Sequence, residues 1–125
     1  MPAPHSHAAR KSSPPPAALI DGIFRALADP TRRDVVARLS AKPASVSELA
    51  APYRMAMPSF LEHLKVLEAS GLVSSEKKGR VRTYQLAAER LKVAEDWLSH
   101  QRRLWERRLD QLDAYLLKLK KDGVT

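Results

Sequence analysis

Apolar residues recur at helical spacing in the first third of the chain and predict two consecutive helices. In the segment that begins at Ala17 they fall at positions i, i+3, i+4 and i+7, which places them on one face of a helix. Asp29 and Pro30 end this helix and begin another, because Asp caps helix N-termini and Pro is tolerated in a first turn. The two apolar faces consist of Ile20, Ile23, Phe24 and Leu27, and of Val35, Val36 and Leu39.

Two further helices joined by a tight turn are predicted after a loop over residues 41–44. Ser45 and Glu48 have the spacing of a capping box, which predicts a short helix from Val46. Beyond a turn, the apolar positions indicate a helix over about residues 57–70. Its inward stripe consists of Phe60, Leu64 and Leu67.

A β-hairpin is predicted after Gly71, which acts as a left-handed helix stop. Residues 72–76 and 80–86 are short β-capable runs joined by a three-residue connection. Strict alternation would mix charged and apolar residues on one face, so a bulge or strong twist is expected near the tip. The connection consists of Lys77, Lys78 and Gly79, and the mixed face of Arg80, Arg82, Tyr84 and Leu86. A helix pair followed by a basic hairpin predicts a winged helix-turn-helix.

The last long segment, from about Ala88 to Lys121, contains no helix breaker and predicts one helix of about 50 Å. Leucine or tryptophan recurs in it at every seventh position, with further apolar residues alongside. This stripe is too long for one small domain to cover, so the same helix of a second copy is the simplest partner. The expected dimer interface consists of Leu91, Leu98, Trp105, Leu112, Tyr115, Leu116 and Leu119.

The composition of the chain narrows the range of possible functions. The 22 Lys and Arg against 14 Asp and Glu give a formal charge of +8, which favours a polyanionic partner such as nucleic acid or an anionic membrane surface. The absence of cysteine excludes disulfides, thiolate metal sites and cysteine nucleophiles. The sequence shows no membrane-spanning apolar run and no secretory signal pattern, so a cytoplasmic protein is expected. It also lacks a Gly-rich phosphate loop and a His-Glu-x-x-His motif, so neither an enzyme nor a cofactor is expected.

The expected fold class is mainly α with a small β-hairpin, arranged in four segments. Residues 1–16 hold five of the nine prolines and predict a disordered tail. Residues 17–87 are expected to form the winged helix-turn-helix DNA-binding domain, and residues 88–121 the dimerisation helix. Residues 122–125 form a short tail.

The candidate DNA-binding residues follow from this arrangement. The outward face of the second helix of such a pair meets base edges, and basic residues around it contact phosphates. His63 lies at the edge of that face, so a role in reading DNA and a hydrogen bond to a neighbouring helix both remain open. In contrast, Arg32, Arg33 and Arg38 are expected mainly to form a solvated face. Candidates for base or groove contact are Ser59, Leu61, Glu62 and His63, and those for phosphates or the minor groove are Arg54, Lys65, Lys77, Lys78, Arg80 and Arg82.

The order of these motifs carries a family resemblance. The stretches ALADPTRRDVVARL, SVSELA, MPSFLEHLKVLEASGLV and KKGRVRTYQL follow one another in the sequence. Over roughly residues 18–118 the chain resembles the ArsR/SmtB family of winged-helix transcriptional regulators. The resemblance implies a homodimer that binds double-stranded DNA at a palindromic operator and represses by occluding a promoter, often until an inducer releases it.

The metal-sensing property of some family members does not carry over. Their thiolate site lies in the helix that matches residues 47–53, where this chain has no sulfur. Their alternative site on the terminal helix would have to draw on Asp96, His100 and Glu106, with one imidazole per chain. No metal site is therefore expected, and the chain is similar to a branch that lacks the metal-sensing cysteines.

Two functions are compatible with these residues. The favoured one is a dimeric, sequence-specific DNA-binding regulator, expected to repress its own or adjacent genes. The alternative is a winged-helix protein-interaction module without specific DNA binding, which would dock through the apolar terminal helix. The four basic residues of the hairpin favour the first function.

Overall fold

The computed structural model describes residues 16–123, which divide into two compact units, a first unit up to Lys92 and a second unit from Val93 onward. The predicted tails over residues 1–16 and 122–125 lie outside this range, apart from Pro16 and residues 122–123. The structure is mainly helical with a small antiparallel sheet and a long terminal helix, which confirms the predicted fold class. No helix within residues 16–123 is both long enough and apolar enough to cross a membrane.

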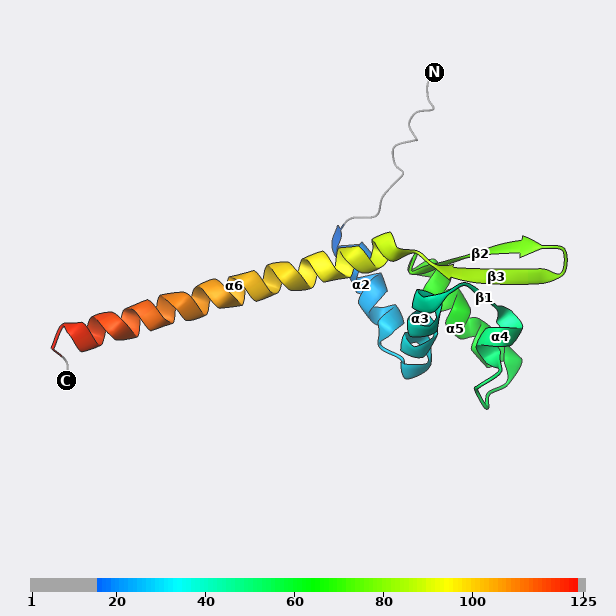
Figure 1. Cartoon of the computed structure of the whole chain (residues 1–125), viewed down its shortest axis with the longest axis horizontal. Helices are drawn as coiled ribbons and strands as arrows, with labels where there is room; N and C mark the ends of the chain where they lie inside the picture. Colours follow the sequence, from blue (N-terminus) through cyan, green and yellow to red (C-terminus); the bar gives the residue numbers. More distant parts are fainter. Residues whose placement is uncertain (1–15, 124–125) are drawn as a thin grey trace, which may run out of the picture. The chain divides into compact units, whose positions relative to one another are not determined.

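Helices α2 (Pro16–Leu27) and α3 (Pro30–Ala41) are the two predicted from the first third of the chain (Figure 1). The carboxylate of Asp29 caps α3 by accepting a hydrogen bond from the Arg32 backbone N–H at 3.0 Å. Pro30 occupies the first turn of α3, where its missing N–H leaves no hydrogen bond unmade. The apolar face of α3 is buried, as is Ile23 of α2, whereas Phe24 on the predicted inward face of α2 is 36% exposed.

Helices α4 (Val46–Ala50) and α5 (Met57–Ala69) form the helix-turn-helix. The predicted capping box begins α4: Ser45 Oγ accepts from the Glu48 backbone N–H, and the Glu48 carboxylate accepts from the Ser45 backbone N–H. Gly71, with φ of +83°, follows α5 as its left-handed stop. The largest fully buried side chains of this unit are Ile23, Val35, Leu49, Phe60, Leu64, Leu67 and Leu72.

The sheet has three strands, β1 (Ala44–Ser45), β2 (Val73–Lys78) and β3 (Val81–Leu86), in the order β1-β3-β2. The loop prediction for residues 41–44 is therefore wrong at both ends, because Ala41 belongs to α3 and Ala44 pairs with Tyr84 of β3. A two-residue strand has no alternation to detect, so only its partner strand reveals it. This third strand ties the start of α4 to the hairpin.

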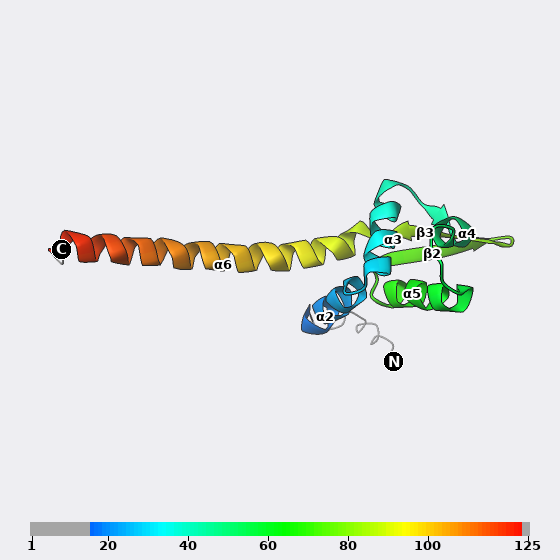
Figure 2. The same cartoon turned by 90° about the horizontal axis from the view of Figure 1, so that it is seen from below.

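The hairpin, which is the wing, differs from its prediction at the tip. Lys77 and Lys78 belong to β2 rather than to the connection, and Gly79, with φ of +64°, forms a two-residue turn with Arg80. The register from Val73 opposite Leu86 to Lys78 opposite Val81 is continuous, so the expected bulge does not occur in it. The mixed face is accommodated differently: Tyr84 is buried, whereas Arg82 on the same face is exposed nearer the tip. Both views show the hairpin projecting past α4 and α5 (Figures 1 and 2).

Helix α6 (Ala88–Lys121) is a continuous 34-residue helix with the predicted bounds. Most of its large apolar side chains are exposed within the chain, including Leu98 at 52% and Trp105 at 60%. Leu91 and Leu119, near the two ends of the predicted row, are half-buried. Most of this apolar row is therefore in contact with solvent in a single chain.

Candidate nucleic-acid interface

The outward face of α5 carries the side chains predicted to read DNA. Ser59, Leu61, Glu62 and Lys65 are all exposed, while Phe60 and Leu64 on the opposite face are buried. Glu62 Oε2 and Lys65 Nζ lie 3.3 Å apart, so this carboxylate and ammonium largely offset each other's charge on the helix surface. This face of α5 is thus nearly neutral, and the positive charge of the first unit lies on other elements.

One exposed apolar residue of α5 is missing from the sequence-based set. Met57 is 46% exposed in the first turn, and Leu61 one turn later is 38% exposed. A spacing of i and i+4 would have indicated that both lie on the same side of the helix. The helix begins without a side-chain cap, because Ala56 at the N-cap makes no such hydrogen bond.

The turn between α4 and α5 is anchored to α3 through Tyr53. The Tyr53 hydroxyl donates to the Asp34 carboxylate, and its ring stacks on Phe60 with centroids 5.5 Å apart. Burial, followed by the hydrogen bond to Asp34, raises the pKa of the Tyr53 hydroxyl. Arg54, the next residue and a predicted phosphate contact, is exposed beside this anchor.

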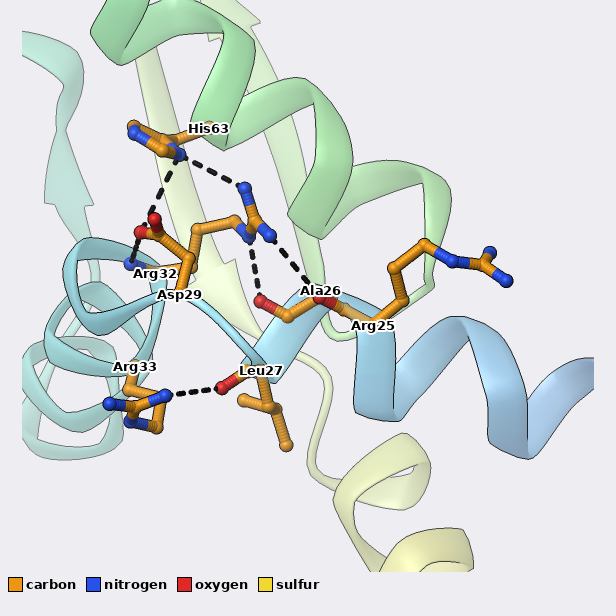
Figure 3. Close-up of polar contacts among 7 residues, drawn as sticks. All are labelled: Arg25, Ala26, Leu27, Asp29, Arg32, Arg33 and His63. Atoms are coloured by element: carbon orange, nitrogen blue, oxygen red, sulfur yellow. Dashed lines mark hydrogen bonds and ion pairs between the residues drawn. The ribbon is translucent and has the colours of Figure 1, made fainter.

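His63 lies in a cluster with the start of α3, shown in Figure 3. Its Nδ1 atom is 3.1 Å from Arg32 Nη1 and 3.7 Å from Asp29 Oδ2. Burial would raise the pKa of Asp29, but the backbone N–H of Arg32 and the electrostatic interactions with His63 and Arg32 lower it below its usual value. The cluster joins the N-terminus of α3 to the middle of α5.

Three arginines that were predicted to form a solvated face instead donate hydrogen bonds to backbone carbonyl groups. Arg32 donates to the Ala26 carbonyl at 2.7 Å and to that of Arg25 at 3.2 Å, while Arg33 donates to the Leu27 carbonyl at 2.8 Å (Figure 3). Similarly, Arg38 reaches the carbonyls at the end of α4, those of Glu48 and Leu49, at 2.8 Å each. These carbonyls lie at or near helix C-termini, which lack intrahelical donors. The solvated-face prediction is wrong for Arg32 and Arg38, which are half-buried, whereas Arg33 is exposed.

The wing carries the four predicted basic residues, and all of them are exposed. Lys77 lies directly opposite Arg82 in the register, so two like charges face each other across the strands. Arg82 Nη1 donates to Ser75 Oγ at 2.8 Å, and Ser75 Oγ donates to the Glu68 carboxylate at 2.7 Å. This chain of hydrogen bonds orients Arg82 and connects the wing to α5.

Below the tip, Tyr84 anchors the wing to the core. Its side chain is buried, and burial together with the negative charge of Glu68 raises the pKa of its hydroxyl. The basic residues therefore project from a strand whose inner half is fixed by packing.

No group of three or more His, Cys, Asp or Glu side chains that could hold a metal ion occurs within residues 16–123. The two surfaces described above for the first unit are the nearly neutral, partly apolar face of α5 and the strongly basic hairpin.

Comparisons with known proteins agree with this geometry. A family model described as a helix-turn-helix domain matches residues 27–76. The HTH-type transcriptional regulator Rv2034 of Mycobacterium tuberculosis is 44% identical over 66 residues, which are 53% of this chain and 62% of that protein. The HTH-type transcriptional repressor SmtB of M. tuberculosis is 37% identical over 82 residues, or 63% of this chain and 61% of that protein. The chain thus spans about three-fifths of the length of these curated relatives.

The similarity to solved structures is more extensive. The crystal structure of an ArsR family transcriptional regulator shares 52% identity, with a TM-score of 0.70, and the match covers 72% of this chain and 93% of that one. An ArsR-like transcriptional regulator from Rhodococcus sp. RHA1 shares 31% identity, with a TM-score of 0.69, over 78% of this chain and 92% of the other.

Fold and site together define a winged helix-turn-helix protein. The chain belongs to the ArsR family of winged-helix transcriptional regulators, which confirms the resemblance seen in the sequence.

Proposed function

We propose that the protein is a homodimer that binds a palindromic operator and represses transcription of its own or adjacent genes. Residues 17–87 form the DNA-binding domain in this proposal, and residues 88–121 the dimerisation helix. The observation that carries it is the combination, in one unit, of the exposed face of α5 with a hairpin whose tip bears four exposed basic residues.

The division of labour within that unit follows from charge. Ser59, Leu61 and Glu62 offer a hydroxyl, an apolar group and an acceptor, which suit base edges in the major groove. Phosphate attraction comes from cations that lie around this face, because Lys65 is already paired with Glu62. The cations that meet the phosphates or the minor groove are Arg54, Lys77, Lys78, Arg80 and Arg82, with Lys65 as a further contact.

Dimerisation supplies the second half of the operator contact. The exposed row along α6 includes Leu98, Trp105, Leu112, Tyr115 and Leu116, each 51 to 60% exposed. A second copy of the helix would cover this row in an isologous interface, because both copies present the same apolar surface. Two winged units held at a fixed spacing then match two half-sites about one helical turn apart.

The test is a binding assay on duplexes selected by the protein from a randomised pool. We expect one palindromic consensus and an affinity that falls steeply with salt. Replacing Arg80 and Arg82 by Ala should reduce the slope of log affinity against log salt by up to about two units. As the matched control, Arg102→Ala and Arg103→Ala on α6 should leave the slope unchanged. If no duplex is enriched even at low salt, the protein is an interaction module rather than an operator-binding repressor.

A further inference from the structure

The contact between Arg32 and His63 fixes the chemical state of the histidine ring. A guanidinium group has only donors, so the 3.1 Å contact from Arg32 Nη1 requires a lone pair on His63 Nδ1. Asp29 Oδ2, at 3.7 Å from the same nitrogen, is too distant to accept a hydrogen bond from it. With Nδ1 as the acceptor of this hydrogen bond, the ring proton resides on Nε2.

The second ring nitrogen is free to interact with a partner outside the cluster. Figure 3 shows Nε2 turned away from Arg32 and Asp29. The His63 side chain is 21% exposed, and within residues 16–123 no buried side-chain nitrogen or oxygen lacks a hydrogen-bond partner. Since Nε2 has no such partner, it reaches solvent.

We propose that Arg32 is a positioning residue that holds His63 as the Nε2–H tautomer, and that this N–H donates a hydrogen bond to a phosphate oxygen of DNA. The DNA contact rests on the proposed function, whereas the tautomer does not. His63 thereby combines the two roles that its sequence position leaves open: Nδ1 joins α5 to α3, and Nε2 contacts the nucleic acid.

A phosphate oxygen is the partner that fits this position. His63 lies on the edge of α5 that faces the start of α3, away from the outward centre marked by Glu62. A side chain at the edge of a recognition helix meets the sugar-phosphate backbone, while the centre of the helix meets the bases. Phosphate oxygens only accept hydrogen bonds, and the guanidinium of Arg32, 3.1 Å from Nδ1, offsets the charge of the Asp29 carboxylate nearby.

The first measurement concerns the protein without DNA. In the ¹⁵N-labelled full chain at about pH 8, above the ordinary imidazole pKa of about 6.5, nitrogen NMR should show His63 with a protonated Nε2 and an unprotonated Nδ1. Arg32→Met should weaken this preference and shift both nitrogen signals towards averaged values. The matched control is Arg33→Met, which removes a neighbouring carbonyl contact but should leave the His63 signals unchanged. A protonated Nδ1 in the unmodified protein would overturn the proposal.

The second measurement concerns DNA. His63→Asn places a carbonyl acceptor near the position of Nδ1 but removes the outward donor. We expect about tenfold weaker binding, equal for a selected duplex and an unrelated one, because a phosphate contact carries no base information. The salt slope should stay unchanged, since a neutral donor releases no counterions.

The outcomes of this comparison separate the alternatives. An affinity loss confined to the selected duplex would show that His63 reads a base, and no loss would show that Nε2 makes no contact. Either result overturns the phosphate assignment. Failure of the unmodified protein to bind any duplex would instead reject the proposed function, with the tautomer still decided by NMR. If His63→Asn lowers the melting temperature, His63→Gln gives a second comparison, because its amide N–H can reach the position of Nε2 and should restore part of the affinity.

Discussion

The first unit and helix α6 bear similar amphipathic patterns but bury them to opposite extents. Phe60, Leu64 and Leu67 of α5 recur at helical spacing and are at most 1% exposed. On α6, Leu98 and Leu112 recur with comparable regularity and remain about half exposed. The pattern alone thus identifies an apolar face but does not say which molecule covers it.

This difference separates two kinds of stabilisation. The buried core of the first unit consists of residues of the same chain. If α6 is covered by a second copy, the stability of that helix depends on protein concentration, because association stabilises the bound state by mass action. Experiments that alter one region and spare the other test this contrast directly.

The largest effect is expected from placing charges in the exposed row. Leu98→Asp together with Leu112→Asp would bury four carboxylates in a homodimer, which should abolish dimerisation and weaken operator binding by at least about 10⁴-fold, or about 5.5 kcal/mol. Light scattering and a band-shift assay measure the two quantities. The control is Leu117→Asp, because Leu117 is 65% exposed and lies off the heptad row. A double variant that stays dimeric would place the interface elsewhere.

A smaller effect is expected from a cavity in the first unit. Leu64 is fully buried, so Leu64→Ala should lower the free energy of unfolding by about 3 kcal/mol. Denaturant titration measures this loss, which should be the same at all protein concentrations as long as the first unit unfolds by itself. Leu117→Ala, on an exposed position of α6, should change the free energy of unfolding by less than about 0.5 kcal/mol.

Single alanine variants of α6 also show whether its exposed apolar row contacts a second copy or only solvent. Leu116→Ala removes an apolar side chain from the exposed row, so its cost should appear as a higher dissociation constant of the dimer. Analytical ultracentrifugation over a range of concentrations measures that constant. If Leu116→Ala and Leu117→Ala have identical effects, the row is not an interface.

The sequence predicts what depends on local interactions. The capping box of Ser45 and Glu48, the cap at Asp29 and the left-handed Gly71 each act over three or four residues, and the structure contains all of them. The second copy of the chain, by contrast, is a prediction that a single chain does not test.

The features that the sequence did not predict depend on contacts between distant residues. Strand β1 exists because Ala44 meets Tyr84, which is forty positions away in the sequence. Likewise, the hydrogen bond between Arg32 and His63 joins residues that are thirty-one positions apart in the sequence. Long cationic side chains can either extend into solvent or fold back onto helix ends, and only the positions of free carbonyl groups decide between the two.

The smallest expected effect concerns the charge of Asp29, which lies at the junction of α3 with α5. Asp29→Asn keeps an acceptor for the Arg32 backbone N–H but removes the charge near the N-terminus of α3, at a cost of about 0.5 kcal/mol near neutral pH. Because the folded-state pKa of Asp29 is lowered from 3.8, its charge stabilises the fold above that pH, and the contribution disappears as the pH falls through the folded-state pKa. Thermal unfolding of the two proteins should therefore differ at pH 7 and converge in acid. A difference that persists or grows in acid would show that Asp29 acts only as a neutral cap, and the charge would then have no part in joining α3 to α5.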